Sequence, residues 1–300
     1  MENLLQFAAI DQHILTILVI DIAIAILLLS AMRFIAGLTA KVNTTDELAV
    51  KDNFAFGISV AGSVAALGIV LTGAITGEHS VSYEVEAIGM FAYGLFGLML
   101  IKLGRLIHDK FALQHLDKIA EIKNRNISVG IIDAASVIAT AIVIRAVLIW
   151  VDGLDVYTFV AIASGFIVSQ VILVLVTRIR ESHFAKNNQK DCMQEALTDG
   201  QVAIAIRYSG HIISTSLAVT AASFFLVYTP ETIVENLLGW LIFGLIMTVV
   251  VSVLTGIAKR IVLWGINMAE EVDQQHNVGV ACVEMAVSIS IALILTALML

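Results

Sequence analysis

Two apolar stretches decide the fold of this chain: NISVGIIDAASVIATAIVIRA at residues 126–146 and NVGVACVEMAVSISIALILTA at residues 277–297. Each is long enough to cross a bilayer as a helix, which takes about 20 predominantly apolar residues. Each begins with asparagine and carries one acid seven residues later, Asp133 in the first and Glu284 in the second. Together they predict a membrane protein that contains an internal repeat.

The overall composition also favours a membrane protein. Apolar residues make up 59% of the chain and charged residues 14%, and the mean hydropathy is +0.95. Soluble domains have roughly 45–50% apolar and 25% charged residues. A soluble chain of this composition would expose large apolar patches and aggregate. We therefore expect the lipid bilayer to be its surroundings.

Eight stretches are long and apolar enough to span a membrane as helices. They lie at residues 14–39, 54–76, 85–107, 127–149, 156–178, 201–227, 233–257 and 278–299. No basic segment precedes the first stretch, so we expect it to be a retained helix and not a cleaved signal peptide. The predicted fold is an all-α bundle of eight transmembrane helices.

The connectors between these helices alternate in charge. Those after the first, third, fifth and seventh helices carry many Lys and Arg residues, whereas those after the second, fourth and sixth carry only acids such as Glu78, Asp152 and Glu231. Basic residues favour the cytoplasmic side of a membrane. This pattern predicts that the basic connectors face the cytoplasm and that both termini face the outside, in the periplasm for a bacterial protein.

The second half of the chain repeats the first. Beside the two stretches quoted above, residues 53–75 match residues 201–223, and the offset between matching residues rises slightly along the chain, as small insertions would produce. The repeats are expected at 1–150 and 151–300, with four helices each. An even number of helices per unit gives both units the same orientation, and hence a pseudo-symmetry axis along the membrane normal.

The unit resembles the YjfL-like bacterial inner-membrane proteins, the family known as domain of unknown function 350. The resemblance rests on Asp52-Asn53 before a helix containing Gly62, and on Asn126 before a helix containing Asp133. Asn277 and Glu284 repeat the latter, whereas Gln201 stands in the second unit where the first has Asn53. The resemblance implies the topology and a bacterial inner membrane, but no mechanism.

Ionisable residues within membrane spans are costly and are therefore candidates for function. With a rise of about 1.5 Å per residue, Asp133, Glu284 and Arg207 lie at similar depths, roughly 10 Å from the basic end of their helices, and His211 lies one turn deeper than Arg207. We expect these four residues to form one inner cluster that lines an ion or solute pathway. The alternative, equally favoured, is that they only hold helices together.

Other polar residues in the spans are expected to be structural. Asp21 and Arg145 lie at matching depth on the outer side and predict an ion pair. Arg33, Lys102 and Arg105 lie near helix ends, where they can extend to the interface. Gln170 is expected to form an interhelical hydrogen bond.

Several functional classes find no support in the sequence. The net charge of −8 disfavours nucleic-acid binding, and the two cysteines, Cys192 and Cys282, indicate neither disulfides nor a metal site. Phosphate-loop, metalloprotease and hydrolase motifs do not occur. We therefore expect no enzymatic activity, cofactor or metal.

Two functions remain. The first is a channel or transporter for a proton, a cation or a small solute, using the intramembrane carboxylates. The second is a membrane scaffold that docks a cytoplasmic protein through connectors 108–126 and 179–199, for example in envelope stress. Either could act as a homo-oligomer. A hydrated cavity that reaches Asp133 or Glu284 would favour transport, and a dry, tightly paired cluster would favour the scaffold.

Overall fold

A computed structural model describes residues 12–76, 82–151, 153–188 and 192–299 of the protein. In these ranges eight helices are long and apolar enough to cross a membrane. They are α1 (Gln12–Ala40), α2 (Phe54–Ile75), α3 (Tyr83–Ile107), α5 (Ile127–Trp150), α6 (Val156–Asn187), α8 (Val202–Thr220), α9 (Ile233–Val262) and α10 (Val278–Ala297). The predicted all-α, eight-helix fold is confirmed.

Some helix ends differ from the prediction. α6 continues nine residues past the expected end at residue 178, because Arg178 pairs with Glu181 one turn later and a charged helix can project beyond the bilayer. The sixth span stops being α-helical at Thr220 and continues as a 3-10 turn, Ala221–Phe225. There the Thr220 and Ser223 hydroxyls bond back to carbonyl oxygens three residues earlier.

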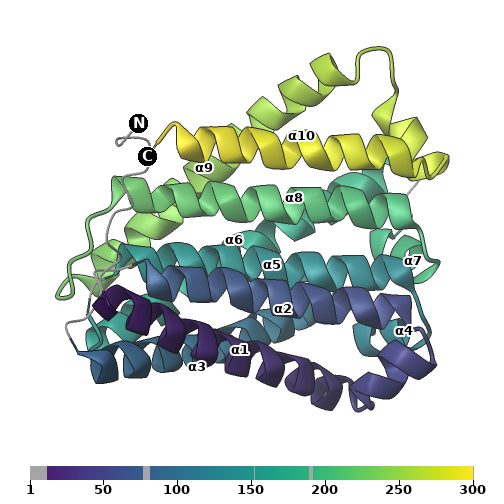
Figure 1. Ribbon diagram of the computed structural model, residues 1–300. Coiled ribbons are helices and arrows are strands. Elements are labelled where there is room, and N and C mark those ends of the chain that lie inside the picture. The colour runs from purple at the N-terminus through teal and green to yellow at the C-terminus, as the bar shows by residue number, and fades with distance from the viewer. Residues whose placement is uncertain (1–11, 77–81, 152, 189–191, 300) are drawn as a thin grey trace, which may run out of the picture.

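The helices form two layers (Figure 1). One layer is a row in the order α2, α5, α8, α10, in which successive helices pack side by side. α1, α3, α6 and α9 pack against this row. Sixteen residues of α5 are buried but only four of α10, since α5 has a neighbour on both sides and α10 ends the row.

Small residues bring the helices of the row close together. A Cβ atom added to Gly62 on α2 would lie 2.5 Å from the Cα of Ala134 on α5. The equivalent atom on Gly210 of α8 would lie 2.6 Å from the Cα of Met285 on α10. Such close backbone approach is how membrane helices gain packing energy where no hydrophobic effect drives them together. The same contact therefore holds both units.

The helices of the row begin in a similar way, at the end of the bundle that carries α4 (Lys118–Lys123) and α7 (Met193–Thr198). Asn53, Asn126 and Asn277 each accept a hydrogen bond from the backbone N–H three residues later. The amide group of each also donates to a preceding glutamate: Glu47, Glu121 and Glu271 respectively. Gln201 occupies the same position before α8 but forms no such cap.

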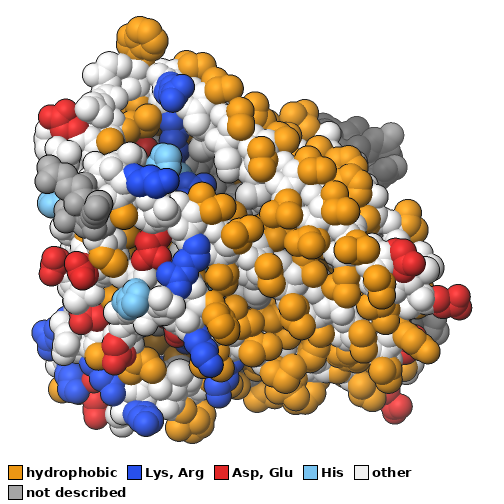
Figure 2. Space-filling view, turned by 180° about the vertical axis from the view of Figure 1, so that it is seen from behind, with side chains coloured by type: hydrophobic (Ala, Val, Ile, Leu, Met, Phe, Trp, Pro, Cys, Tyr) orange, Lys and Arg blue, Asp and Glu red, His pale blue; other side chains and the backbone are white. Residues whose placement is uncertain are grey.

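The surface divides into an apolar belt and a charged end. Figure 2 shows hydrophobic side chains over most of the visible face, with Lys and Arg gathered toward one end and only acidic side chains at the other. This distribution fits a helix bundle that crosses a bilayer. The chain is a multi-pass membrane protein.

The polar connectors fold back onto the charged end. A π-helical turn at His108–Ala112 extends α3, and α4 follows it as a separate short helix. Leu113 and Leu197 are fully buried there. Gln194 on α7 accepts a hydrogen bond from the backbone of His115 and donates one to Glu181, which ties the connectors of the two units together.

Candidate functional site: equivalent buried carboxylates and cavities in the two units

In the first unit, Asp133 lies on α5 in a cluster of donors from three other elements. Its Oδ1 pairs with the ammonium group of Lys118 on α4 at 3.1 Å. Its Oδ2 pairs with Arg105 on α3 at 3.0 Å and accepts a hydrogen bond from the Ser59 hydroxyl on α2. Lys118, whose side chain is only 3% exposed, also pairs with Asp109. This carboxylate is fully engaged.

In the second unit, Glu284 on α10 is the equivalent acid and has a different set of partners. Arg207 on α8 donates from Nε to its Oε2 at 2.5 Å, and the Nζ of Lys259 on α9 lies 3.8 Å from its Oε1. Arg207 also pairs with Asp273 and donates to the Met268 carbonyl oxygen. Arg207 thus holds two acids at once.

The inner cluster expected from the sequence forms only in part: Arg207 pairs with Glu284, one of its two possible acids, whereas Asp133 lies in a different cluster. Asp133 and Glu284 belong to separate clusters, and Arg207 joins only the second. α5 and α8 are neighbours, but Asp133 contacts α2, α3 and α4, whereas Arg207 contacts α10 and the turn before it. Depth can be estimated from sequence, but the direction of a side chain around its helix cannot be fixed by depth alone.

The predicted outer pair is not formed either. Arg145 donates from Nε to the Thr72 hydroxyl at 3.0 Å, and the ion pairs among the described residues do not include one between Arg145 and Asp21. Asp21 is buried on α1, which packs on α2 and α3. Gln170 does donate to the Thr140 hydroxyl at 3.3 Å, across α6 and α5.

Several members of the clusters were not among the sequence candidates. Arg105 was expected to anchor the interface but turns inward, and Lys118 was assigned to a connector. The repeat could have revealed that the clusters differ. Asp109 in the first unit occupies the position of Lys259 in the second, so the charge is reversed at equivalent sites near a buried acid. Opposite charges at equivalent positions predict that the two acids are neutralised differently.

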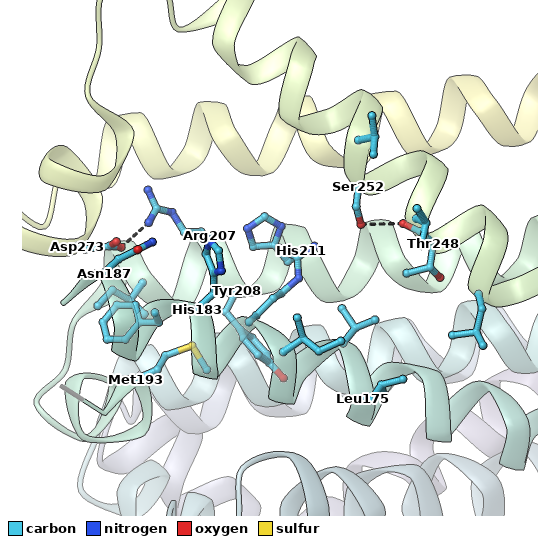
Figure 3. A pocket seen from close by; sticks show the side chains of 18 residues that line it. Leu175, His183, Asn187, Met193, Arg207, Tyr208, His211, Thr248, Ser252 and Asp273 are labelled. Atoms are coloured by element: carbon cyan, nitrogen blue, oxygen red, sulfur yellow. Dashed lines mark hydrogen bonds and ion pairs between the residues drawn. The ribbon is translucent and has the colours of Figure 1, made fainter. Parts of the chain in front are cut away.

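A cavity adjoins each cluster, and the two cavities lie at equivalent places in the two units. The first, about 110 Å³, lies between α1, α2, α3 and α4 and reaches Asp133, Ser59 and Ser63. The second, about 570 Å³, lies between α6, α8 and α9 and is shown in Figure 3. Arg207 and His211 line the second cavity where the serines line the first.

The second cavity is amphipathic. Figure 3 places Asp273, Asn187 and Arg207 toward one end, and Leu175 and Thr248 toward the other. His211 lies between these ends, and Arg180, Arg207 and Lys259 are all close enough to interact with it electrostatically. Outside the spans, burial raises the pKa of Asp273, and Arg207 opposes that shift.

The clusters have no obvious metal chemistry. Within the described ranges no group of three or more His, Cys, Asp or Glu side chains is placed to hold a metal ion. Each acid is instead met by Lys and Arg nitrogen atoms, which are donors and never metal ligands when charged. The arrangement can bind a polar or charged solute by exchanging one of these internal pairs for the solute.

Comparison with known proteins identifies the family. Searches of curated proteins and of solved structures find no match. A family model, described as Domain of Unknown Function (DUF350), matches the chain twice, over residues 9–148 and 153–299. The two matches confirm the tandem arrangement of two units. The protein therefore belongs to the DUF350 family, in a form that carries two of its units in tandem.

Proposed function

We propose that the protein is a transporter or channel for a small solute or ion, in which each four-helix unit supplies one binding site near the charged end of the bundle. The observation that carries the proposal is the pair of equivalent cavities, each of which reaches the cluster around a buried acid. Two cavities at equivalent positions in units whose sequences have diverged are better explained by a shared function than by chance.

The buried acids act in this proposal by holding cations in place. Asp133 holds Arg105 and Lys118, and Glu284 holds Arg207 and Lys259. A solute that enters the cavity competes for these cations and releases the acid, which then takes up a proton or another cation. Exchange of partners within a low-dielectric site couples binding to rearrangement of the helices that carry them.

Flux across liposomes that contain the purified protein tests the proposal. We expect an acetate, phosphate, proton or potassium flux above that of empty liposomes, reduced at least tenfold in Asp133→Asn and in Glu284→Gln. Glu235→Gln is the matched control, because Glu235 is an exposed acid in the first turn of α9. Absence of every one of these fluxes across a range of pH, with correctly folded protein, would contradict transport.

The scaffold alternative receives less support from the connectors. Leu113 and Leu197 are buried against the bundle and Gln194 joins the two connectors to each other, so these described parts of 108–126 and 179–199 are held by the bundle. The orientation in an inner membrane, a homo-oligomer and a cytoplasmic partner remain predictions. Cysteine accessibility from each side of intact cells tests the orientation, with labelling of Cys variants in the basic connectors expected from the cytoplasm alone.

A further inference from the structure

The cavity of the second unit has a charged end and an apolar end along the helix axes. His183 and Asn187, near the end of α6, line it together with Arg180, whereas Leu175 and Val176 line it further into the helix. With a rise of about 1.5 Å per residue, His183 and Leu175 are separated by roughly 12 Å along the helix. The charged end is at the end of the bundle, and the apolar end points toward its middle.

Two polar groups of this cavity have no partner. The Nε of Arg180 and the Nδ1 of His211 are buried and lack a hydrogen-bond partner. Glu284 attracts the Arg180 guanidinium from a distance, but no ion pair of Arg180 occurs among the described residues. Buried polar groups are normally satisfied, and a buried charge without a partner is costly. A cation kept in this state at a cavity indicates a site that an anion completes.

The balance of charges around the cavity also favours an anionic ligand. Arg180 and Arg207 are the cations that line it, and Asp273 is the acid that lines it and pairs with Arg207. The cations therefore exceed the acids by one. An anionic group at Arg180 would balance this excess, whereas a cation would increase it.

The apolar end of the cavity opens to the lipid-facing surface. Leu175 on α6 and Val249 and Val253 on α9 line it, and they are 46%, 61% and 55% exposed. These residues lie in helices that are long and apolar enough to span a membrane, so in a bilayer their exposed faces would meet lipid chains. A ligand with an apolar chain can thus enter from the side, between α6 and α9, without crossing the charged end.

We infer that this cavity binds an anionic amphiphile, with a carboxylate or phosphate head at Arg180 and Arg207 and an apolar chain between α6 and α9. The ligand has the polarity of a lipid in the adjacent leaflet, with its head at the charged end and its chain toward the membrane centre. A volume of about 570 Å³ is within the usual range of small-molecule sites, about 300–1,000 Å³. This ligand would be the class of solute that the second unit takes, and its role in transport rests on the proposed function.

The first unit lacks the features that carry this inference. Ile35 lines its cavity at the position of Arg180, and Lys102 at the position of Ser252. The cavity is about 110 Å³, too small for an extended chain. Asp133 is already bound by three donors, so amphiphile binding is expected of the second unit only.

Binding to the wild-type protein provides the first test. The full chain, purified in an uncharged detergent, is titrated with cis-parinarate, a fluorescent fatty acid, and the bound probe is displaced with oleate, oleyl alcohol or inorganic phosphate. We expect one site per chain, displacement by oleate, and at least tenfold weaker displacement by oleyl alcohol and by phosphate. If oleyl alcohol displaced the probe as well as oleate does, the charge of the head group would have no role in binding. If phosphate did so, the apolar chain would have no role. Either result would overturn the inference.

The two possible sources of such a ligand are separated in a second arm. Nanodiscs that contain phosphatidylglycerol are compared with nanodiscs that contain only phosphatidylcholine. If probe binding is lost only in the phosphatidylglycerol nanodiscs, an anionic membrane lipid occupies the site and is the ligand. If the probe binds equally in both kinds of nanodisc, the ligand is a free single-chain acid. Loss of probe binding in both lipids alike would show a site that does not select an anion and would overturn the inference.

Arg180 variants give the decisive comparison. Arg180→Gln is expected to weaken cis-parinarate binding at least tenfold, since a hydrogen-bonded charge contact is lost, while Arg180→Lys keeps binding within about threefold. Arg178→Gln is the matched control, because Arg178 lies on the same helix, pairs with Glu181 and does not line the cavity. Unchanged binding in Arg180→Gln would overturn the inference. Binding that depends on Arg180 without any flux would leave the inference intact and contradict the transport function.

Discussion

The two units carry the same acid but neutralise it with different parts of the fold. In the first unit the cations come from α3 and α4, and Ser59 on α2 supplies a third donor. In the second unit the position of Ser59 is taken by Arg207, and the other cation comes from α9. The acid is the shared element, and its partners have been redistributed after duplication.

The redistribution changes what each cavity can do. Around Asp133 two acids and two cations are paired in a small space, which fixes helix positions. Beside the cluster of Glu284 the cavity is about five times larger, and the Nε of Arg180 has no hydrogen-bond partner among the described residues. A repeated fold can thus hold a small site with a fully paired acid in one unit and a larger site with an incompletely bonded cation in the other, and this difference is open to test.

The largest expected effect is the loss of the first acid. Asp133→Asn leaves Arg105 and Lys118 without their shared carboxylate and should lower the free energy of unfolding by about 3–5 kcal/mol. Glu284→Gln should cost less, about 1–3 kcal/mol, because Arg207 keeps Asp273 and the larger cavity admits water. Titration with a denaturing detergent measures both. A larger loss in Glu284→Gln would contradict this order.

The next largest expected effect concerns the close helix contact that the two units share. Gly62→Ala and Gly210→Ala each place a methyl group against the backbone of the neighbouring helix and should cost about 1–3 kcal/mol through overpacking. Gly68→Ala is the matched control on α2, since no atom lies within 4 Å of the added Cβ, and it should be neutral or slightly stabilising. Markedly different costs at Gly62 and Gly210 would show that the two interfaces are no longer equivalent.

The sequence predicts the shared features better than the differences. The spans follow from the length of the apolar stretches. The repeat follows from residues such as Asn126 and Asn277, whose side chain is among those favoured at the start of a helix. The grouping of Asp133 with Arg207 failed because depth was known and direction was not. Lys118 was missed because a buried lysine in a polar connector has no distinguishing pattern.

A smaller change in stability, of opposite sign in the two units, distinguishes an arginine that binds a ligand from one that stabilises the fold. Arg105→Gln removes a partner of Asp133 and should destabilise the protein by about 1–3 kcal/mol. Arg180→Gln removes a cation without a partner and should raise stability by about 1 kcal/mol, as is common where a functional group is kept at the expense of stability. Thermal unfolding in detergent compares them. Destabilisation by Arg180→Gln would mean that Arg180 supports the fold.

The smallest expected effect concerns the start of α8, where the second unit departs from the pattern of the other row helices. Gln201 does not cap the helix, and its Oε1 is buried without a partner. Gln201→Asn supplies the shorter side chain that accepts a backbone N–H at Asn53 and Asn277, so unfolding should require about 0.5–1 kcal/mol more. The reverse exchange, Asn277→Gln, should cost a similar amount and also release Glu271. If Gln201→Asn instead destabilises the protein, the longer side chain has a role in the second unit that the cap geometry does not explain, and the difference between the units extends to the helix start that lies only six residues from Arg207.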